Sequence, residues 1–326
     1  MSASDGNKAV MIDTVHAIGS VAAEALTNHR ELIGDRNVRL VERGDWPEIA
    51  PELEAVLALK LPERDWNDAH RLRLVQAMSV GTDQFLPLPG LRDDVIIATA
   101  SGLSAAPMAE FAATAFMMLA KDFPGAAALQ AQRRWQRTEP LVIAGQRVVI
   151  LGAGPVGLGT AERLAAFGVN VVAVCRRPRP LPNVAETVGV DRMDDILPSA
   201  DGLIIALPLN HQTRHVIGPQ QIDLLPAHAV IVNVARGGLI DEPALERALR
   251  AGRLRGAVLD VTETEPLPAD SSLWTCPRMH LTAHVSWTDP DYVRSIVALF
   301  AENVVNVESG RPIRNAIDRD LGYPVS

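Results

Sequence analysis

Three residues whose types suit acid–base chemistry each follow a short apolar run in the second half of the sequence. They are Arg236, Glu265 and His284, and the runs span residues 229–234, 256–261 and 280–283. An arginine can bind a carboxylate through two parallel hydrogen bonds and polarise a neighbouring ketone. Histidine exchanges a proton near neutral pH, and a nearby carboxylate would orient its imidazole and favour the protonated form. The three types therefore suit reduction of a carbonyl next to a carboxylate. The simpler alternatives are an arginine that binds surface carboxylates and a structural histidine.

The apolar runs predict strands of a parallel sheet, and this sheet must position the three residues. Further strands are expected at residues 148–151, 169–174 and 202–207, and a helix capped by Asp241 is expected to run to residue 249. Polar residues that follow successive parallel strands gather at one edge of the sheet. Asp260 lies near the end of one of these strands and joins the group.

A glycine-rich turn follows the strand at residues 148–151. Gly152, Gly154 and Gly157 form the Gly-x-Gly-x-x-Gly pattern, with a small-residue helix after it and a second strand after the helix. The first glycine permits a tight turn, the second admits a pyrophosphate, and the third lets the helix pack on the strand. With Pro155 and Val156 between them, these residues predict a dinucleotide site at the helix N-terminus, and a plain βα turn is the alternative.

The first part of the chain repeats the alternation of strands and helices after a polar tail that ends near residue 8. Strands are expected at residues 9–12, 38–41, 55–59 and 72–76, with a helix at 22–32. The order predicts an α/β fold with a parallel sheet. Lys60 follows one strand and could face a substrate. The turn Met78, Ser79, Val80 and Gly81 follows the next strand and could present backbone N–H groups to a carboxylate. An exposed lysine and an ordinary turn are the simpler alternatives.

The longest helical pattern spans residues 104–121. Ser104 is placed to cap it, and apolar residues recur at helical spacing around much of its circumference. The helix is therefore expected in the core or at a contact between subunits. Arg133, Arg134 and Arg137 after it suit a solvated surface, and Trp135 could anchor an interface.

Composition limits the class of protein. The chain has 326 residues, enough for two domains, and it is 48% hydrophobic and 21% charged, as is ordinary for a globular protein. A net charge of −8 argues against nucleic-acid and anionic-membrane partners. Two cysteines cannot build a disulfide framework, and no metal-ligand spacing is present. Without a signal-peptide pattern or an apolar stretch of about 20 residues, a reducing cytoplasm is expected.

Taken together, the motifs resemble the D-isomer-specific 2-hydroxyacid dehydrogenase family from about Ala9 to Tyr323. The motifs are GAGPVGLGTAERLAAFG at 152–168, ADGLIIALPLNHQTRHVIG at 200–218, VNVARGGLIDEPALERAL at 232–249, AVLDVTETEPLP at 257–268 and TAHVSW at 282–287. The last three are specific to the family in combination. The resemblance implies two Rossmann-like doubly wound parallel-sheet domains. The substrate domain would be discontinuous, at residues 1–102 and 288–326, and residues 103–287 would bind the dinucleotide.

The resemblance also implies roles for individual residues. Arg236 would bind and polarise a 2-oxo acid, His284 would donate the proton, and Glu265 would pair with His284. Asp260 would hold the nicotinamide carboxamide, backbone at Val80 and Gly81 would meet the substrate carboxylate, and the helix from Ser104 would help to form a homodimer. The other expected cofactor contacts are Leu207, Pro208, Thr213, Val234 and Ala235, with His284.

Two positions depart from the family pattern. Where an NAD-selective member has an acidic residue after the second strand, this chain has Cys175, followed by Arg176, Arg177 and Arg179. Without the acid there is no acceptor for the ribose 2′-hydroxyl, and arginines could hold a 2′-phosphate, so we expect NADP to be preferred and NAD to remain possible. A solvated basic turn is the alternative. The second departure is Ala283, which replaces the proline that commonly precedes the histidine and puts the rigidity of this loop in doubt.

The sequence thus predicts a cytoplasmic, NADP-dependent 2-oxo acid reductase that forms a homodimer. The resemblance implies glutamine in place of Glu265 in relatives that oxidise formate, so formate oxidation is disfavoured. Phosphite oxidation would use the same trio and is an alternative. A corepressor-like protein that binds the nucleotide without turnover is the alternative from another class. Lys60, Leu61, Met78, Ser79 and Trp287 are candidates for the pocket of the substrate side chain, whose identity is not legible.

Overall fold

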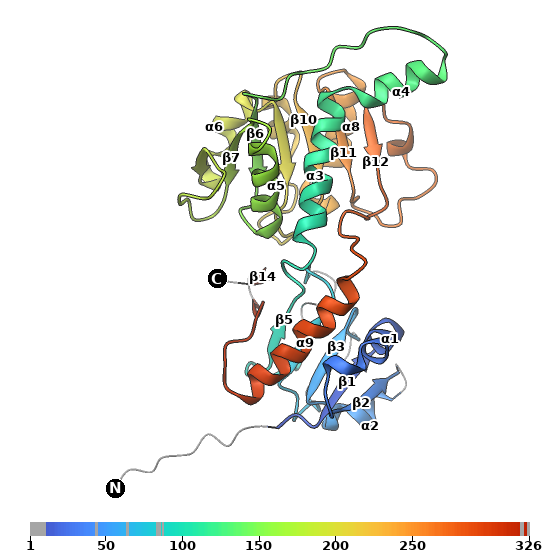
Figure 1. Cartoon of the computed structure of the whole chain (residues 1–326), viewed down its shortest axis with the longest axis vertical. Helices are drawn as coiled ribbons and strands as arrows, with labels where there is room; N and C mark the ends of the chain where they lie inside the picture. The colour runs from blue at the N-terminus through green and yellow to red at the C-terminus, as the bar shows by residue number, and fades with distance from the viewer. Residues whose placement is uncertain are drawn as a thin grey trace. The chain divides into compact units, whose positions relative to one another are not determined.

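The computed structural model describes residues 11–42, 45–62, 65–82, 86, 88–319 and 323–324. The chain divides into two compact units (Figure 1). One unit contains residues up to Leu103 and from Asp289 onward, and the other spans Ser104–Thr288. Each is built on its own parallel sheet, so the predicted α/β class with two doubly wound sheets is confirmed.

The sheet of the Ser104–Thr288 unit has seven strands in the order β12-β11-β10-β9-β6-β7-β8, all parallel. The strands are β6 Arg147–Leu151, β7 Asn170–Val174, β8 Glu186–Val188, β9 Gly202–Ile205, β10 Val230–Asn233, β11 Gly256–Leu259 and β12 Met279–Leu281. The strand order reverses between β6 and β9. In such sheets, ligands bind at the carboxyl ends of the strands beside this reversal.

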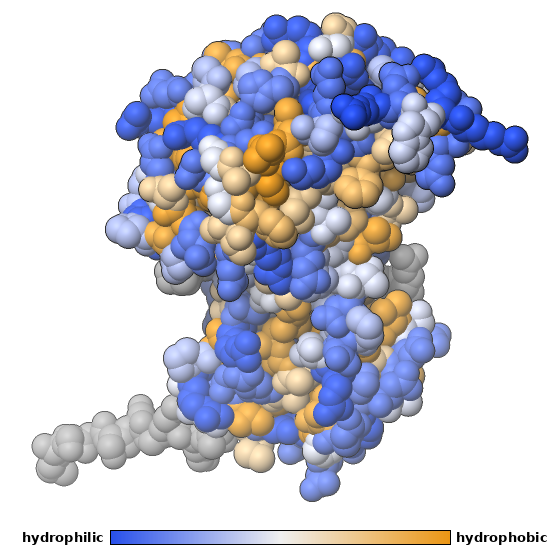
Figure 2. All heavy atoms as spheres, turned by 45° about the horizontal axis from the view of Figure 1, so that its top comes forward, coloured by the Kyte–Doolittle hydropathy of each residue, from blue (hydrophilic) through white to orange (hydrophobic). Residues whose placement is uncertain are grey.

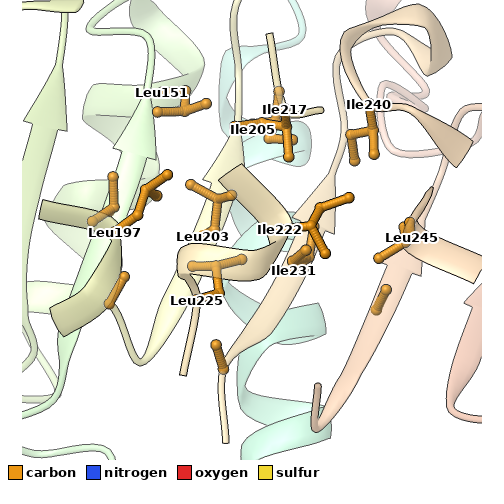
Figure 3. Packing of buried hydrophobic residues seen from close by; sticks show 14 of the residues in the cluster. Leu151, Leu197, Leu203, Ile205, Ile217, Ile222, Leu225, Ile231, Ile240 and Leu245 are labelled. Atoms are coloured by element: carbon orange, nitrogen blue, oxygen red, sulfur yellow. The ribbon is translucent and has the colours of Figure 1, made fainter. Parts of the chain in front are cut away.

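Helices cover both faces of this sheet, because successive side chains of each strand point to opposite faces and both sets are apolar. On one face, α3 (Ala105–Ala120) and α5 (Pro155–Ala165) pack side by side on residues such as Val148, Ile150 and Val232. On the other face, α6 (Met193–Ile196), α7 (Pro219–Leu224) and α8 (Glu242–Arg250) pack on the alternate residues. Figure 3 shows Leu151, Leu203, Ile205 and Ile231 of the strands facing Ile222 and Leu245 of these helices.

The sheet of the other unit has the order β2-β1-β3-β4-β5, again parallel. Its strands are β1 Thr14–Ile18, β2 Asn37–Val41, β3 Ala55–Ala58, β4 Leu74–Ala77 and β5 Ile96–Ala98. Helices α1 (Ser20–Asn28) and α9 (Tyr292–Glu308) share one apolar cluster with this sheet. The opposite face packs on α2 (Trp46–Ile49), where Trp46 meets Trp66 edge to face at 4.5 Å between ring centroids. A short antiparallel pair, β13 (Ile317–Asp318) and β14 (Tyr323–Pro324), completes this unit.

Two predictions about local structure were wrong. The first strand is Thr14–Ile18, whereas it was expected at residues 9–12, of which 9 and 10 lie outside the described residues together with the predicted tail. The actual strand includes a buried histidine, His16, which interrupts the apolar pattern. Ser104 precedes α3 but does not cap it, because its hydroxyl is buried and accepts no hydrogen bond from the helix among the described residues.

One helix of the Ser104–Thr288 unit contributes no residue to the apolar clusters on the two faces of its sheet. The nine residues of α4 (Phe123–Ala131) are mostly apolar, yet none is buried. Phe123 is 66% exposed and Trp135, which follows the helix, is fully exposed.

The face drawn in Figure 2 is mainly hydrophilic, with hydrophobic residues in small patches. Among the described residues, no helix is long and apolar enough to cross a membrane.

Candidate active site

The glycine turn after β6 has the geometry that a pyrophosphate requires. Gly152 has a φ of +106°, and a Cβ there would lie 2.5 Å from the carbonyl oxygen of Ala206. A Cβ on Gly157 would lie 1.9 Å from the carbonyl oxygen of Gly152, so only glycine lets α5 approach the strand. A Cβ on Gly154 would meet nothing within 4 Å, which leaves open space beside the first N–H groups of α5. The turn therefore fits a dinucleotide at the reversal of strand order.

Cys175 is the residue after β7, the strand that follows the glycine turn and α5. Its thiol donates to the carbonyl oxygen of Arg177 at 3.3 Å. Arg176, Arg177 and Arg179 are exposed, and within the described residues the guanidinium groups of Arg177 and Arg179 make no ion pair. The end of β7 therefore offers positive charge where a ribose-binding acid would stand.

The loop after β9 contains the predicted cofactor contacts Leu207, Pro208 and Thr213. The Thr213 hydroxyl donates to the carbonyl oxygen of Pro208 at 2.8 Å and accepts from the N–H of Asn210 at the same distance. Thr213 thus links residues 208 and 210 and stabilises the loop. Its contact with the cofactor stays a prediction.

Arg236 follows β10, and two neighbours determine its position. The side chain of Asn233 donates to the carbonyl oxygen of Arg236 at 2.8 Å and accepts from the N–H of Ala235 at 3.0 Å. A Cβ on Gly237 would lie 2.0 Å from the carbonyl carbon of Thr262, so this glycine lets the loop after β10 pack directly on the loop after β11. The sequence analysis missed Asn233, although an asparagine inside an apolar strand run is unusual enough to signal it.

Glu265 and His284 form a hydrogen-bonded pair at the ends of β11 and β12. Oε2 of Glu265 lies 2.8 Å from Nδ1 of His284, and Oε1 accepts from the N–H of Thr262 at 3.0 Å. Both side chains are about one third exposed. Nε2 of His284 has no hydrogen-bond partner among the described residues, so it can face a substrate while Nδ1 is held by the carboxylate.

Asp260 anchors the loop that contains His284. Its carboxylate is fully buried and accepts hydrogen bonds from the Thr282 hydroxyl at 2.6 Å and from the N–H groups of Val285 and Ser286 at 2.9 Å. The N–H of His284 donates to the backbone oxygen of Asp260 at 2.8 Å. These bonds hold His284 at its φ of +54°, an uncommon conformation for a residue with a side chain. The loop is thus fixed without a proline at position 283. A contact between Asp260 and the nicotinamide stays a prediction.

A second carboxylate–imidazole pair, which the sequence analysis missed, joins the loop after β11 to the loop after β9. Oε1 of Glu263 is 2.6 Å from Nε2 of His215, and the N–H of Glu263 donates to Glu242 at 2.7 Å. Burial raises the pKa of Glu242, and the nearby negative charges of Glu263 and Glu265 raise it further. Three glutamates therefore gather at the edge of the sheet where Arg236 and His284 lie. No group of three His, Cys, Asp or Glu side chains among the described residues has the geometry of a metal site.

The predicted substrate contacts divide between the two units. Lys60 is exposed after β3, and the turn Ser79–Gly81 follows β4. Trp287 is 41% exposed and belongs to the unit that contains His284, whereas Lys60 and the turn belong to the other unit. Arg236, Glu265 and His284 follow the neighbouring strands β10, β11 and β12, as predicted.

Comparison with known proteins places the sequence in a family. Residues 113–286, just over half of the chain, match the model described as the D-isomer specific 2-hydroxyacid dehydrogenase, NAD binding domain. A D-3-phosphoglycerate dehydrogenase of Methanocaldococcus jannaschii is 32% identical over 77% of this chain, but the match covers 48% of that protein. Glyoxylate/hydroxypyruvate reductase A of Salmonella newport is 31% identical over 78% of this chain and 82% of its own length. The chain thus spans about half the length of the phosphoglycerate dehydrogenases that it matches.

Solved structures agree with this placement. A D-isomer specific 2-hydroxyacid dehydrogenase from Xanthobacter autotrophicus Py2, in complex with NADPH and MES, is 28% identical with a TM-score of 0.87. An NADPH-dependent glyoxylate/hydroxypyruvate reductase from Sinorhizobium meliloti, in complex with NADP and sulfate, is 26% identical with a TM-score of 0.86. Each match covers 96% of this chain and 100% of the other.

Proposed function

The chain belongs to the D-isomer specific 2-hydroxyacid dehydrogenase family, and from this premise we propose that it interconverts a small 2-oxo acid and its D-2-hydroxy acid with NADP(H). The observation that carries the proposal is the 2.8 Å contact between Nδ1 of His284 and Oε2 of Glu265. These two residues follow β12 and β11, and Arg236 follows β10, the next strand of the sheet. This contact leaves Nε2 available for proton transfer.

The proposed roles follow from the chemistry of each side chain. When bound, the reduced nicotinamide supplies a hydride to the ketone carbon. His284 holds a proton on Nε2 and gives it to the ketone oxygen, while Glu265 orients the ring through Nδ1. Arg236 binds the substrate carboxylate and draws electron density from the ketone oxygen. In oxidation of the hydroxy acid the same imidazole accepts the proton.

We assign the cofactor to the unit Ser104–Thr288, with residues 103–287 as the dinucleotide-binding domain. The glycine turn would hold the pyrophosphate, and Asp260 would accept a hydrogen bond from the nicotinamide carboxamide. The preference for NADP is supported by Cys175 and the uncommitted guanidinium groups of Arg177 and Arg179 after β7, and by the NADPH and NADP in two similar structures.

We assign the substrate to the discontinuous domain of residues 1–102 and 288–326, with Trp287 at its border. The turn Ser79–Gly81 would bind the carboxylate through its backbone N–H groups, and Lys60 would meet the substrate side chain. The unburied apolar helix α4 and the exposed Trp135 support a homodimer through the dinucleotide-binding domain, together with α3. Two free thiols suit the cytoplasmic setting that we expect.

The test is NADPH oxidation followed at 340 nm with glyoxylate, hydroxypyruvate, pyruvate and bulkier 2-oxo acids. Turnover of at least one acid, with a higher kcat/KM for NADPH than for NADH, is expected. Tight NADPH binding with no turnover across the panel would contradict the enzymatic proposal and favour a protein that only binds the nucleotide. Equal or better kcat/KM with NADH would contradict the cofactor preference alone.

A further inference from the structure

Hydrogen bonds fix the turn after β4 on both sides of two backbone N–H groups, those of Val80 and Gly81. The N–H of Met78 donates to the carbonyl oxygen of Ala58 at 2.8 Å, and the carbonyl oxygen of Ser79 accepts from the N–H of Ala100 at 3.0 Å. The Ser79 hydroxyl donates to the carbonyl oxygen of Gly81 at 2.9 Å. Among the described residues, the N–H groups of Val80 and Gly81 donate to nothing. Two adjacent N–H groups without partners form a concave anion site if the backbone around them is fixed.

The carbonyl oxygen of Met78, one peptide before that of Ser79, is also fixed, and its partner comes from the far end of the sequence. The hydroxyl of Tyr292, the first residue of α9, donates to this oxygen at 2.5 Å. Burial raises the pKa of Tyr292 to about 12, so its hydroxyl remains a donor at any pH at which the protein works. The ring of Tyr292 packs in the same apolar cluster as Met78, Ile296 and Phe300. Both its ring and its hydroxyl are therefore constrained.

We propose that Tyr292 is a positioning residue for substrate binding: its hydrogen bond to Met78 orients the peptide that begins the turn, so that the N–H groups of Val80 and Gly81 converge on the carboxylate of the 2-oxo acid. The inference rests on the proposed function, because it concerns the same carboxylate. The Met78 carbonyl and the Ser79 N–H share one rigid peptide plane, so fixing the oxygen fixes the direction in which the turn starts. Small displacements of a substrate-positioning group can weaken binding or catalysis strongly.

The direct test is Tyr292→Phe, which keeps the ring and removes only the donor. A carboxylate contact is made in the ground state and in the transition state alike, so KM for the 2-oxo acid should rise about tenfold while kcat stays within about twofold. The dissociation constant of NADPH should not change. Ser309→Ala is the matched control, because it removes a hydroxyl that donates to a backbone carbonyl at 2.7 Å near the other end of α9. This control should leave KM unchanged.

A second variant acts on the turn itself. Ser79→Ala removes the hydrogen bond from the other end of the turn and should raise KM in the same way. For both variants, calorimetry should show about tenfold weaker binding of oxamate, a carboxylate analogue of 2-oxo acids, to the NADPH-loaded protein.

The outcomes separate the two proposals. If the wild type neither turns over any 2-oxo acid nor binds oxamate, the proposed function fails, and this inference fails with it. If the wild type is active and Tyr292→Phe keeps KM and oxamate affinity within twofold of wild type, only the inference is overturned. A parallel loss of kcat, NADPH affinity and melting temperature would also overturn it, because it would show a merely structural role.

Discussion

Glu265 and Glu263 lie on the same loop after β11, and each contacts an imidazole. Glu265 lies 2.8 Å from His284, and Glu263 lies 2.6 Å from His215. Only the first pair leaves Nε2 of its histidine uncommitted, because in the second pair Nε2 itself meets the carboxylate. This difference supports the proposal that the first pair transfers the proton and that the second does not.

Substituting the two glutamates separately tests this difference. Glu265→Gln should lower kcat about 10²-fold, the lower end of what general acid–base catalysis contributes, because the imidazole loses its negative partner. Glu263→Gln should change kcat less than about threefold. Steady-state turnover of NADPH with the best 2-oxo acid measures both effects. Equal losses in the two variants would contradict the assignment.

We expect individual residues to determine cofactor selectivity as well. Cys175→Asp places a carboxylate after β7, where it can bind a ribose 2′-hydroxyl and repel a 2′-phosphate. We expect the ratio of kcat/KM for NADPH to that for NADH to fall at least about tenfold, which corresponds to about 1.4 kcal/mol. Cys276→Ala, at the other cysteine, is the control and should leave the ratio unchanged. A ratio unaltered by Cys175→Asp would show that the end of β7 does not meet the ribose.

At the scale of elements, the helix caps differ in a way that can be measured. The Asp241 side chain accepts a hydrogen bond from the N–H of Ala244 at 2.8 Å at the start of α8, whereas Asp291 precedes α9 without such a bond. Asp241→Ala should cost about 1 kcal/mol and lower the melting temperature by about 2–4 °C. Asp291→Ala should leave the melting temperature within about 1 °C. Scanning calorimetry of the two variants measures both melting temperatures. Equal decreases in melting temperature would contradict the role of the Asp241 cap.

Strand β1 contains a buried group that makes stability depend on pH. His16 is fully buried, and neither ring nitrogen has a hydrogen-bond partner among the described residues. Burial, with the nearby charge of Arg39, lowers its pKa from 6.5 to about 4. The folded state binds this proton less readily than the unfolded state does. The free energy of unfolding is therefore highest above about pH 6.5, where His16 is neutral in both states, and it declines as the pH falls toward 4.

The expected size of this effect is about 2 kcal/mol between pH 7.5 and pH 5. His16→Leu cannot be protonated, so it should gain about that much stability relative to wild type over the same interval. Urea unfolding at the two pH values measures the change. His70→Leu, at an exposed histidine of the same unit, is the control and should follow the wild type. A constant difference between His16→Leu and wild type would contradict the prediction.

Elements with strong local signals could be predicted from the sequence, and those that depend on distant partners could not. The glycine turn, the cap at Asp241 and the strands before Arg236, Glu265 and His284 are contiguous patterns, and the structure has them where expected. The first strand was misplaced because a histidine interrupts its apolar run. Tyr292 was missed because it contacts Met78 across 214 positions, and no local pattern encodes such a contact.

At the scale of the whole molecule, the proposed catalytic residues and the turn proposed to bind the carboxylate belong to different doubly wound units. The dinucleotide-binding unit contains every proposed proton-transfer residue, and the other unit contains the turn proposed to bind the carboxylate. Family motifs made this division predictable. The side chain of the substrate was not predictable, because few chemically distinctive residues mark its pocket and Lys60 suits several polar substituents.

Assembly gives a prediction at this scale. An apolar helix of nine residues with none buried is unstable on its own, so α4 should pack against a second copy of the chain. Sedimentation equilibrium should give twice the chain mass. Trp135→Ala should weaken the dimer at least about tenfold, whereas Trp274→Ala, at another exposed tryptophan, should not. A monomer at micromolar concentration would contradict the proposed dimer.

The central claim is that the imidazole of His284 moves the proton in a reaction driven by NADPH. Its most direct test is the steady-state turnover of His284→Ala beside its affinity for NADPH, measured by fluorescence titration. We predict that kcat falls by about 10²–10⁴-fold while the dissociation constant of NADPH stays within about twofold of wild type. Turnover that survives within about tenfold of wild type would contradict it.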